Sequence, residues 1–249
     1  MTAQINFDFT GTSVLVSGGT SGIGNATARL FRDAGADVTV TGTKAAVADY
    51  DTDLAGMQYR QLRIGDAASV DALAREFETL DVLINNAGAN FPGGLDESTP
   101  EGFEASVGVN LLGPYRLTAG LHTALASSTA AGGASVVSLA SMSALRSVPM
   151  VPGYGAAKSG IINITRNLAA KWAADGIRVN AVAPGVTKTN MTAPMEHIPQ
   201  IADAELAHVP MGRFATVDEI APTIAFLCSE ASSYTSGALV IIDGASDCL

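Results

Sequence analysis

Tyr154 and Lys158 are the pair of side chains with the clearest chemical potential in the sequence, because they stand four residues apart. On a helix this spacing places both side chains on one face, about 6 Å apart at their Cβ atoms. A free tyrosine has a pKa near 10, and a neighbouring ammonium group favours the phenolate form. Tyr154 could then take a proton from an alcohol or give one to a carbonyl oxygen. Taken alone, the spacing also describes an ordinary solvated helix face.

A glycine-rich segment, Ser17–Gly24, lies between an apolar stretch and a helical one. Its glycines at 18, 22 and 24 permit a tight turn and a close approach of the backbone to a ligand. The N–H groups at the start of the following helix then face an anion, for which a pyrophosphate is the best candidate. A plain strand-to-helix turn is the alternative for this pattern on its own.

The elements that must position these residues alternate along all 249 residues. The predicted strands are 13–17, 37–41, 58–64, 81–85, 134–140, 177–183 and 238–242, and the predicted helices are 23–34, 68–79, 100–127, 154–175 and 217–229, with a weaker one at 44–55. Most of the strands are apolar on both faces, which is typical of a parallel sheet covered by helices on each side. Strict alternation predicts right-handed βαβ units in one doubly wound α/β sheet.

One long segment, at about residues 186–216, interrupts this alternation between the sixth and seventh strands. Loops longer than about 12–15 residues tend to be functional lids or disordered. Its apolar residues include Met191, Met195, Ile198 and Leu206, so we predict a loop that covers a substrate.

The composition excludes several other classes of protein. With 47% hydrophobic and 15% charged residues, the chain can bury a core and is not expected to be disordered. A net charge of −10 argues against a nucleic-acid partner. No apolar run approaches the roughly 20 residues that span a bilayer, and the first residues carry no secretory signal, so we expect a soluble, cytoplasmic protein without a membrane partner. Cys228 and Cys248 have neither the number for a disulfide framework nor the spacing of a zinc site, so no metal is predicted.

An ordered series of motifs resembles the short-chain dehydrogenase/reductase family, in its shorter type. The motifs are Ser17–Gly24 with the spacing Ser/Thr-Gly-x-x-x-Gly-x-Gly, Asn85–Gly88, Asn110, Ser141, Tyr154–Lys158, Pro184-Gly185 with Thr189, and Asp243-Gly244. The resemblance covers the whole chain and implies a single-domain Rossmann fold over residues 1–249, with a seven-stranded parallel sheet flanked by helices on both faces. It also implies an oxidoreductase that transfers hydride with NAD or NADP.

The catalytic set that the resemblance implies is Asn110, Ser141, Tyr154 and Lys158. In the family reading, Tyr154 is the general acid/base and Ser141 hydrogen-bonds the substrate oxygen. Ser138 and Ser143 are nearby competitors, and only the spacing favours Ser141. Asn110 would hold a water that links Lys158 to solvent. The alternative is a surface asparagine near a kink at Gly113-Pro114.

The predicted cofactor-binding residues are Gly18, Thr20, Ser21, Gly22, Ile23, Gly24, Thr43, Lys44, Arg63, Ile64, Asn86, Ala87, Gly88, Tyr154, Lys158, Gly185, Thr187 and Thr189. NAD-specific relatives end the second strand with an acid that binds the ribose 2′-hydroxyl, and this chain has none there. Thr43 and Lys44 could bind a 2′-phosphate, which favours NADP over NAD. Ser21, however, stands where NADP enzymes often carry Arg or Lys. Arg63 either contacts the cofactor or is solvated.

The substrate pocket that the resemblance implies consists of Phe91, Ser143, Leu145, Met150, Met191 and Met195. These mostly apolar, adaptable side chains predict a cyclic, steroid-like or aromatic small molecule, interconverted between secondary alcohol and ketone. No cationic residue is obviously placed to bind a substrate carboxylate. The first alternative is a 3-oxoacyl reductase acting on acyl carrier protein or coenzyme A thioesters, although few basic residues are available to dock an acidic carrier.

Two other classes of protein and the oligomeric state can also be considered from the sequence. A non-catalytic nucleotide-sensing protein would be expected to lose Tyr154, Lys158 or Ser141, and all three are present. A sugar-nucleotide epimerase or dehydratase would have a longer chain with an extra substrate domain. The resemblance implies a homotetramer or dimer, with the helices 100–127 and 154–175 in one interface and the C-terminal strand in another.

Overall fold

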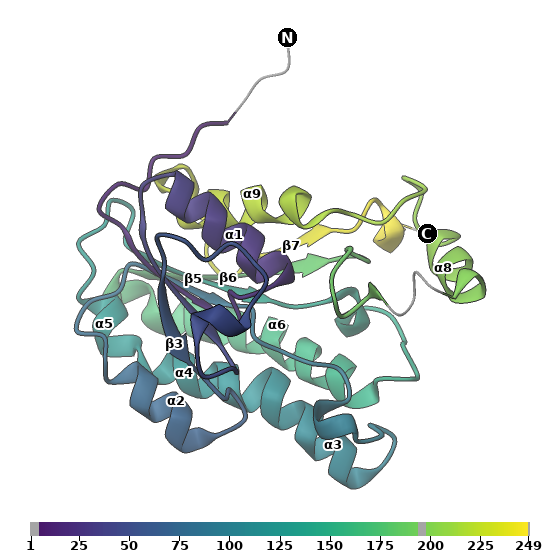
Figure 1. Cartoon of the computed structure of the whole chain (residues 1–249). Coiled ribbons are helices and arrows are strands. Elements are labelled where there is room, and N and C mark those ends of the chain that lie inside the picture. The colour runs from purple at the N-terminus through teal and green to yellow at the C-terminus, as the bar shows by residue number, and fades with distance from the viewer. Residues whose placement is uncertain (1–4, 194–197, 249) are drawn as a thin grey trace.

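The structure, a computed structural model, describes residues 5–193 and 198–248. Its central element is a sheet of seven parallel strands (Figure 1). The strands are β1 (Ser13–Ser17), β2 (Asp37–Gly42), β3 (Gln58–Gln61), β4 (Val82–Asn85), β5 (Ala134–Leu139), β6 (Ile177–Pro184) and β7 (Leu239–Ile242). Their order is β3-β2-β1-β4-β5-β6-β7, and every pair is parallel. The order reverses between β1 and β4, where doubly wound sheets bind ligands at the carboxyl ends of the strands. The predicted fold class is therefore confirmed.

Helices cover both faces of the sheet (Figure 1). The α-helices of the described residues are α1 (Gly22–Asp33), α2 (Ala67–Ala74), α3 (Pro100–Val107), α4 (Gly113–Gly120), α5 (His122–Ala126), α6 (Pro152–Trp172), α8 (Pro199–Leu206) and α9 (Val217–Cys228), of which α8 lies away from the sheet. On one face, α1 and α9 bury Phe31 and Ile224 against the strands. On the other face, α4 and α6 bury Leu117 and Leu168. Each such side chain contributes roughly 1.5–3 kcal/mol on burial, so the sheet is held rigidly between two apolar layers.

Three predicted elements differ from the structure. The helix expected at 100–127 is broken into α3, α4 and α5, with a π-helical turn at Gly108–Leu112. The weak helix at 44–55 is reduced to a 3₁₀ turn at Val47–Asp49. The covering loop contains α8. Amphipathic periodicity could not reveal the break, because Asn110 stabilises the π turn through contacts with residues distant in sequence. Among the described residues, no helix is both long and apolar enough to cross a membrane.

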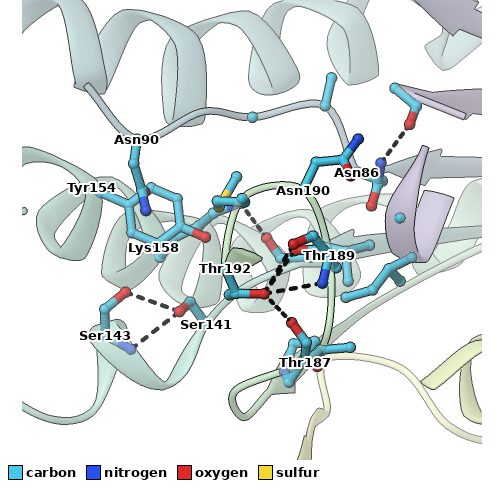
Figure 2. Close-up of a pocket in the computed structure, with 18 of the residues that line it drawn as sticks. Asn86, Asn90, Ser141, Ser143, Tyr154, Lys158, Thr187, Thr189, Asn190 and Thr192 are labelled. Atoms are coloured by element: carbon cyan, nitrogen blue, oxygen red, sulfur yellow. Dashed lines mark hydrogen bonds between the residues drawn. The ribbon is translucent and has the colours of Figure 1, made fainter. Parts of the chain in front are cut away.

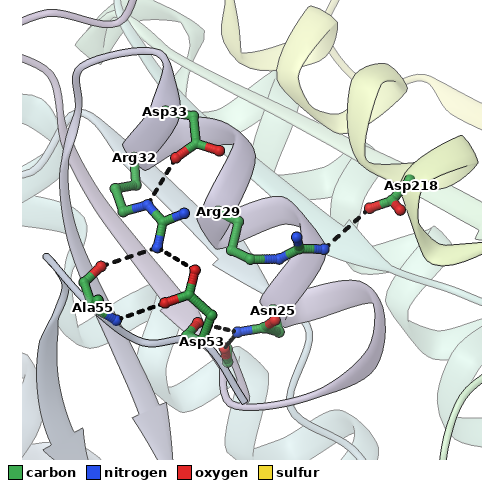
Figure 3. A network of polar contacts seen from close by, with 8 residues as sticks. Asn25, Arg29, Arg32, Asp33, Asp53, Ala55 and Asp218 are labelled. Carbon is green, nitrogen blue, oxygen red and sulfur yellow. Dashed lines mark hydrogen bonds and ion pairs between the residues drawn. The ribbon is translucent and has the colours of Figure 1, made fainter.

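A polar network joins the segment after β2 to α1 (Figure 3). Arg32 donates to the Asp53 carboxylate at 2.9 Å and to the Ala55 carbonyl at 3.0 Å. The Asn25 amide donates to the Asp53 carbonyl at 3.1 Å, and Arg29 pairs with Asp218 of α9 at 3.2 Å. The ion pairs are solvent-exposed and contribute about 0–1 kcal/mol each. The contacts of Asn25 and Arg32 fix the loop beside the glycine-rich turn, whereas the Arg29–Asp218 pair joins α1 to α9.

Candidate active site

A cavity of about 440 Å³ lies at the carboxyl ends of the strands, and its wall brings together most of the predicted site. The predicted residues that line it are Gly18, Thr20, Ser21, Gly22, Ile23, Thr43, Ile64, Asn86, Ala87, Gly88, Ser141, Ser143, Tyr154, Lys158, Gly185, Thr187, Thr189 and Met191. The glycine-rich turn and the Tyr154–Lys158 pair therefore face one space, although about 130 residues separate them in the chain.

The glycine-rich turn fits the diphosphate of a dinucleotide. Gly18 has φ +66°, and a Cβ atom there would lie 2.9 Å from the Cα of Ala87. Ser21 is the N-cap of α1 but makes no capping hydrogen bond with its side chain, so the first N–H groups of the helix remain available to an anion. Gly24 is different, because it does not line the cavity. A Cβ there would collide with the Asn86 side chain, so Gly24 permits close packing of α1.

Lys44 and Arg63, two of the three basic residues predicted to contact the cofactor, do not line the cavity, whereas Lys158 does. The Lys44 ammonium group donates to the carbonyl of Asp49 and lies 4.8 Å from the centre of the Tyr50 ring. Arg63 is exposed, and its backbone N–H donates to Ser69 at 3.1 Å. Thr43, which follows β2 directly, does line the cavity.

The Tyr154–Lys158 pair lies on the first two turns of α6 (Figure 2). Lys158 is only 4% exposed, its Nζ donates to the Leu139 carbonyl at 2.6 Å, and it lies 5.4 Å from the centre of the Tyr154 ring. A main-chain acceptor at the end of β5 thus fixes the ammonium group directly beside the phenol.

Ser141 follows β5 and points into the same space (Figure 2). Its Oγ accepts hydrogen bonds from the Ser143 hydroxyl at 2.9 Å and the Ser143 N–H at 3.2 Å, which leaves its own proton for another acceptor. Ser138 is buried in the sheet, where its Oγ accepts from Asn85 at 3.2 Å. Of the three competing serines, Ser141 and Ser143 line the cavity, and Ser138 is instead one of the residues that tie neighbouring strands together.

Burial dominates the electrostatics of the pair. It raises the pKa of Tyr154 to about 12; a hydrogen bond from Ser141 opposes this rise, and the negative charge of Glu97 adds to it. Burial also lowers the pKa of Lys158 to about 8. In the structure, the pKa of Tyr154 therefore lies above its ordinary value, although a neighbouring ammonium group favours the phenolate form. The reason is that a phenolate loses more by leaving water than the hydrogen bond from Ser141 returns.

Asn110 is completely buried, so the alternative of a surface asparagine is wrong. Its Oδ1 accepts the N–H of Ala89 at 3.0 Å, and its Nδ2 donates to the carbonyls of Ala89 at 2.8 Å and Ser106 at 3.0 Å. It does not line the cavity, and the side chain instead fixes the segment after β4 that does. Its link to a water beside Lys158 stays a prediction.

The substrate pocket was predicted less well than the catalytic residues. Phe91, Leu145 and Met150 do not line the cavity and are 39, 42 and 70% exposed, because their side chains turn away into solvent. Met195 lies outside the described residues. Residues that sequence reasoning missed also line the cavity: Asn90, Arg146, Val148, Asn190, Thr192 and Glu205. No motif marks these positions, since they meet only in the folded chain.

Arg146 is a cationic residue of the cavity wall, whereas from the sequence no cationic residue has an obvious place to bind a substrate carboxylate. It lies five residues after Ser141, lines the cavity, and its Nη2 is 2.7 Å from Oε2 of Glu205 on α8. Both side chains are about one-third exposed, at 31% and 28%. The pair joins the covering segment, which is the long segment at about residues 186–216, to the wall that carries Ser141. Among the described residues, no three His, Cys, Asp or Glu side chains gather as a metal site.

The covering segment is closed at its base. The Lys188 N–H donates to the Ala215 carbonyl at 2.9 Å, and the Ala215 N–H donates to the Val186 carbonyl at 3.0 Å. Within it, the Thr192 hydroxyl donates to the Thr187 carbonyl at 2.6 Å and accepts the Thr189 N–H at 3.0 Å (Figure 2). The ends of the segment are thus hydrogen-bonded to each other on the edge of the cavity.

The doubly wound sheet, the glycine-rich turn and the buried tyrosine–lysine pair define a dinucleotide-dependent oxidoreductase. A family model described as enoyl-(acyl carrier protein) reductase matches residues 18–245. The chain is 33% identical over 252 residues to D-threitol dehydrogenase of Mycolicibacterium smegmatis, a match that covers 97% of this chain and 95% of that one. It is 36% identical over 239 residues to cis-4-hydroxycyclohexanecarboxylate dehydrogenase of Sinomonas cyclohexanicum, with 92% and 94% covered.

A solved structure with bound NADP is also similar. It is a protein of Agrobacterium tumefaciens, provisionally named a 2-deoxy-D-gluconate 3-dehydrogenase, with a TM-score of 0.84 and 29% identity over 99% of this chain and 100% of that one. The chain belongs to the short-chain dehydrogenase/reductase family. It is an oxidoreductase that acts on CH–OH groups of small molecules with a nicotinamide dinucleotide.

Proposed function

We propose that the protein interconverts a secondary alcohol and a ketone, with Tyr154 as the general acid/base. The observation that supports this proposal is that Ser141, Tyr154 and Lys158 line the same cavity as the glycine-rich turn. A bound nicotinamide supplies the hydride acceptor for oxidation and the hydride donor for reduction. In oxidation the Tyr154 phenolate takes the proton of the alcohol, and in reduction the Tyr154 phenol gives its proton to the carbonyl oxygen.

Each residue of the set has a distinct task in this proposal. Ser141, whose Oγ already accepts from Ser143, donates its proton to the substrate oxygen without adding a charge to the site. Lys158, held on the Leu139 carbonyl, makes the phenolate of Tyr154 less costly during turnover. Asn110 orders the segment after β4, and we keep for it the predicted link to solvent.

We propose NADP as the preferred cofactor. The support is the sequence Thr41–Lys44 after β2, which has no acid to repel a 2′-phosphate, together with the position of Thr43 in the cavity wall. In this proposal the Lys44 ammonium group leaves the Asp49 carbonyl and binds the 2′-phosphate instead. The measurement is kcat/KM with each cofactor, for which we expect at least a roughly tenfold preference for NADP. A strong preference for NAD would contradict the proposal.

For the substrate we propose a small molecule with an apolar, cyclic or aliphatic body and a polar group at one end. Val148, Val151 and Met191 supply apolar contacts, while Arg146 and Glu205 supply a charged pair. Apolar pockets with a few well-placed polar groups fix the orientation of a ligand in this way. The purely apolar substrate predicted from the sequence is modified accordingly.

The test is a panel of alcohols and ketones followed by NADPH absorbance. It contains cyclic ketones, hydroxycycloalkane carboxylates, polyols, steroids and 3-oxoacyl thioesters. Turnover of cyclic or aliphatic alcohols that carry a second hydroxyl or a carboxylate supports the proposal. Exclusive turnover of 3-oxoacyl thioesters would favour the acyl reductase instead, and no turnover of any member would overturn the proposed reaction. The homotetramer or dimer stays a prediction, which light scattering can test.

A further inference from the structure

The loop before α3 carries a carboxylate that is almost completely buried. Glu97 is 1% exposed, whereas its neighbours Asp96 and Ser98 face solvent. An ionised carboxylate is costly to bury unless hydrogen bonds compensate the loss of water. Glu97 has two such bonds, because Oε1 accepts the N–H of Phe91 at 3.0 Å and Oε2 accepts the N–H of Tyr154 at 2.7 Å.

The second bond replaces a missing helix cap. The first N–H groups of a helix have no acceptor within it, and the N-cap of α6, Val151, has no side chain that can accept. Glu97 accepts one of these N–H groups from a position 57 residues away, and the positive end of the helix dipole favours its charge. Gly153 permits the close approach, since a Cβ there would lie 3.1 Å from Oε2 of Glu97 and 2.9 Å from the Cβ of Ser106.

The first bond reaches a second segment of the cavity wall, the one after β4. Phe91 has φ +49°, a left-handed conformation that is unfavourable for a bulky residue and must be supported by its surroundings. It follows Asn90, which lines the cavity. One carboxylate therefore joins the segment after β4 to the turn of α6 that carries Tyr154.

The charge of Glu97 also acts on the phenol. The charged side chain that faces Tyr154 from its own helix is Lys158, and the one from the loop before α3 is Glu97. Glu101 and Glu104 of α3 are exposed, and Arg146 is paired with Glu205. The negative charge of Glu97 adds to burial in raising the pKa of Tyr154. It therefore opposes loss of the phenolic proton.

We propose that Glu97 is a positioning residue for the reaction, which fixes the first turn of α6 and keeps Tyr154 in its protonated form. The inference rests on the proposed acid/base role of Tyr154. It assigns a function to a buried carboxylate that never touches the substrate.

The decisive variant is Glu97→Gln, which keeps the volume but removes the charge and one of the two acceptors. We expect kcat to fall roughly tenfold, because Tyr154 is less well placed, and KM for the cofactor to change less than about twofold. Removing a negative charge makes the phenolate less costly. The rise of the oxidation rate with pH should therefore move to lower pH, by roughly half a unit or more.

Two controls separate charge from structure. Glu97→Asp keeps the charge but shortens the side chain, so kcat should fall while the pH profile moves less than in Glu97→Gln. Asp81→Asn removes a part-buried carboxylate at the other end of the sheet, which accepts from Ser13 N–H at 2.8 Å and Ser128 at 2.6 Å. It should lower Tm without moving the pH profile. If Glu97→Gln behaves like Asp81→Asn, the proposal is wrong.

A titration that needs no turnover makes the test independent of the substrate. In chains labelled with ¹³C at the tyrosine ζ carbon, the Tyr154 signal is identified by its loss in Tyr154→Phe. It should begin to move at lower pH in Glu97→Gln than in the parent, and equal titration would overturn the proposal. Absence of turnover in the whole panel would instead count against the proposed function alone. Should Glu97→Gln not fold, a parent-like kcat in Glu97→Asp would also overturn the proposal.

Discussion

Two walls of the cavity are held in place by different means. The catalytic wall carries Tyr154 and Lys158 on a long helix, where a main-chain carbonyl fixes a nearly inaccessible ammonium group. The covering wall carries α8 and is joined to the rest of the cavity by Arg146 and Glu205, whose side chains are about one-third exposed. Main-chain contacts within buried elements tolerate little movement, whereas one partly exposed ion pair is weak. The first wall is thus suited to chemistry, and the second to admitting and selecting a substrate.

The largest effect should come from the catalytic wall. Tyr154→Phe removes only the phenolic oxygen, so we expect kcat to fall roughly 10³-fold while the cofactor still binds. Initial rates and a fluorescence titration with NADPH measure the two quantities. Tyr234→Phe, the same change at a fully exposed tyrosine, is the matched control and should leave both unchanged. Near-parental activity in Tyr154→Phe would contradict the assignment of the chemistry to the catalytic wall.

The next effect is on stability and concerns Lys158. Burial lowers the pKa of Lys158 from 10.5 to about 8, so between these values the unfolded chain binds the proton and the folded chain does not. The free energy of unfolding therefore gains from this group as pH rises through that range. Relative to Lys158→Met, the parent should gain about 3 kcal/mol between about pH 8 and pH 10.5.

Denaturant unfolding of both chains at several pH values across this range measures the difference. Lys171→Met, at an exposed lysine of the same helix, is the control and should show no such trend. A constant difference between the parent and Lys158→Met would mean that the ammonium group is not costly to bury, and that the catalytic wall is less tightly packed than its geometry indicates.

The smallest effect should come from the covering wall. Arg146→Met and Glu205→Gln each remove one partner of the pair, so we expect KM for the substrate to rise roughly tenfold while kcat changes less than about threefold. A double-mutant cycle gives the coupling between the two side chains. The matched control is Arg29→Met with Asp218→Asn, an ion pair that joins α1 to α9 and does not line the cavity. A fall in kcat equal to that of Tyr154→Phe would show that the covering wall takes part in the chemistry.

The same division explains what the sequence could predict. Tyr154 and Lys158 are four residues apart and lie in one helix, so local spacing was enough to place them. The glycine-rich turn follows a strand directly, so its position at the sheet edge was also predictable. Glu97, Arg146 and Glu205 escaped prediction because their partners are 57 or 59 residues away in the chain. Contacts of that kind depend on the path of the chain in space and leave no periodic signal.

Burial was the second quantity that the sequence could not supply. An asparagine in a predicted helix was open to either a buried or a surface interpretation, and only the π turn at Gly108–Leu112 decides for Asn110. Likewise, the spacing of Tyr154 and Lys158 predicts their proximity but not the loss of solvent that controls both pKa values. The resemblance places apolar residues such as Met150 in the pocket by their position in the chain, but the direction of their side chains depends on the backbone of a loop, and Met150 is exposed.

The hydrogen bonds between Val186, Lys188 and Ala215 join the two ends of the segment between them. Its entry and exit are joined to each other beside the end of β6, so changes of length or sequence inside it need not disturb the register of β6 with β7. New substrates can thus be accommodated by replacing one closed piece of chain, while the groups that handle the proton stay where they are. For protein engineering, replacing the segment between these hydrogen bonds offers a route to altered substrate selectivity while Ser141, Tyr154 and Lys158 stay unchanged.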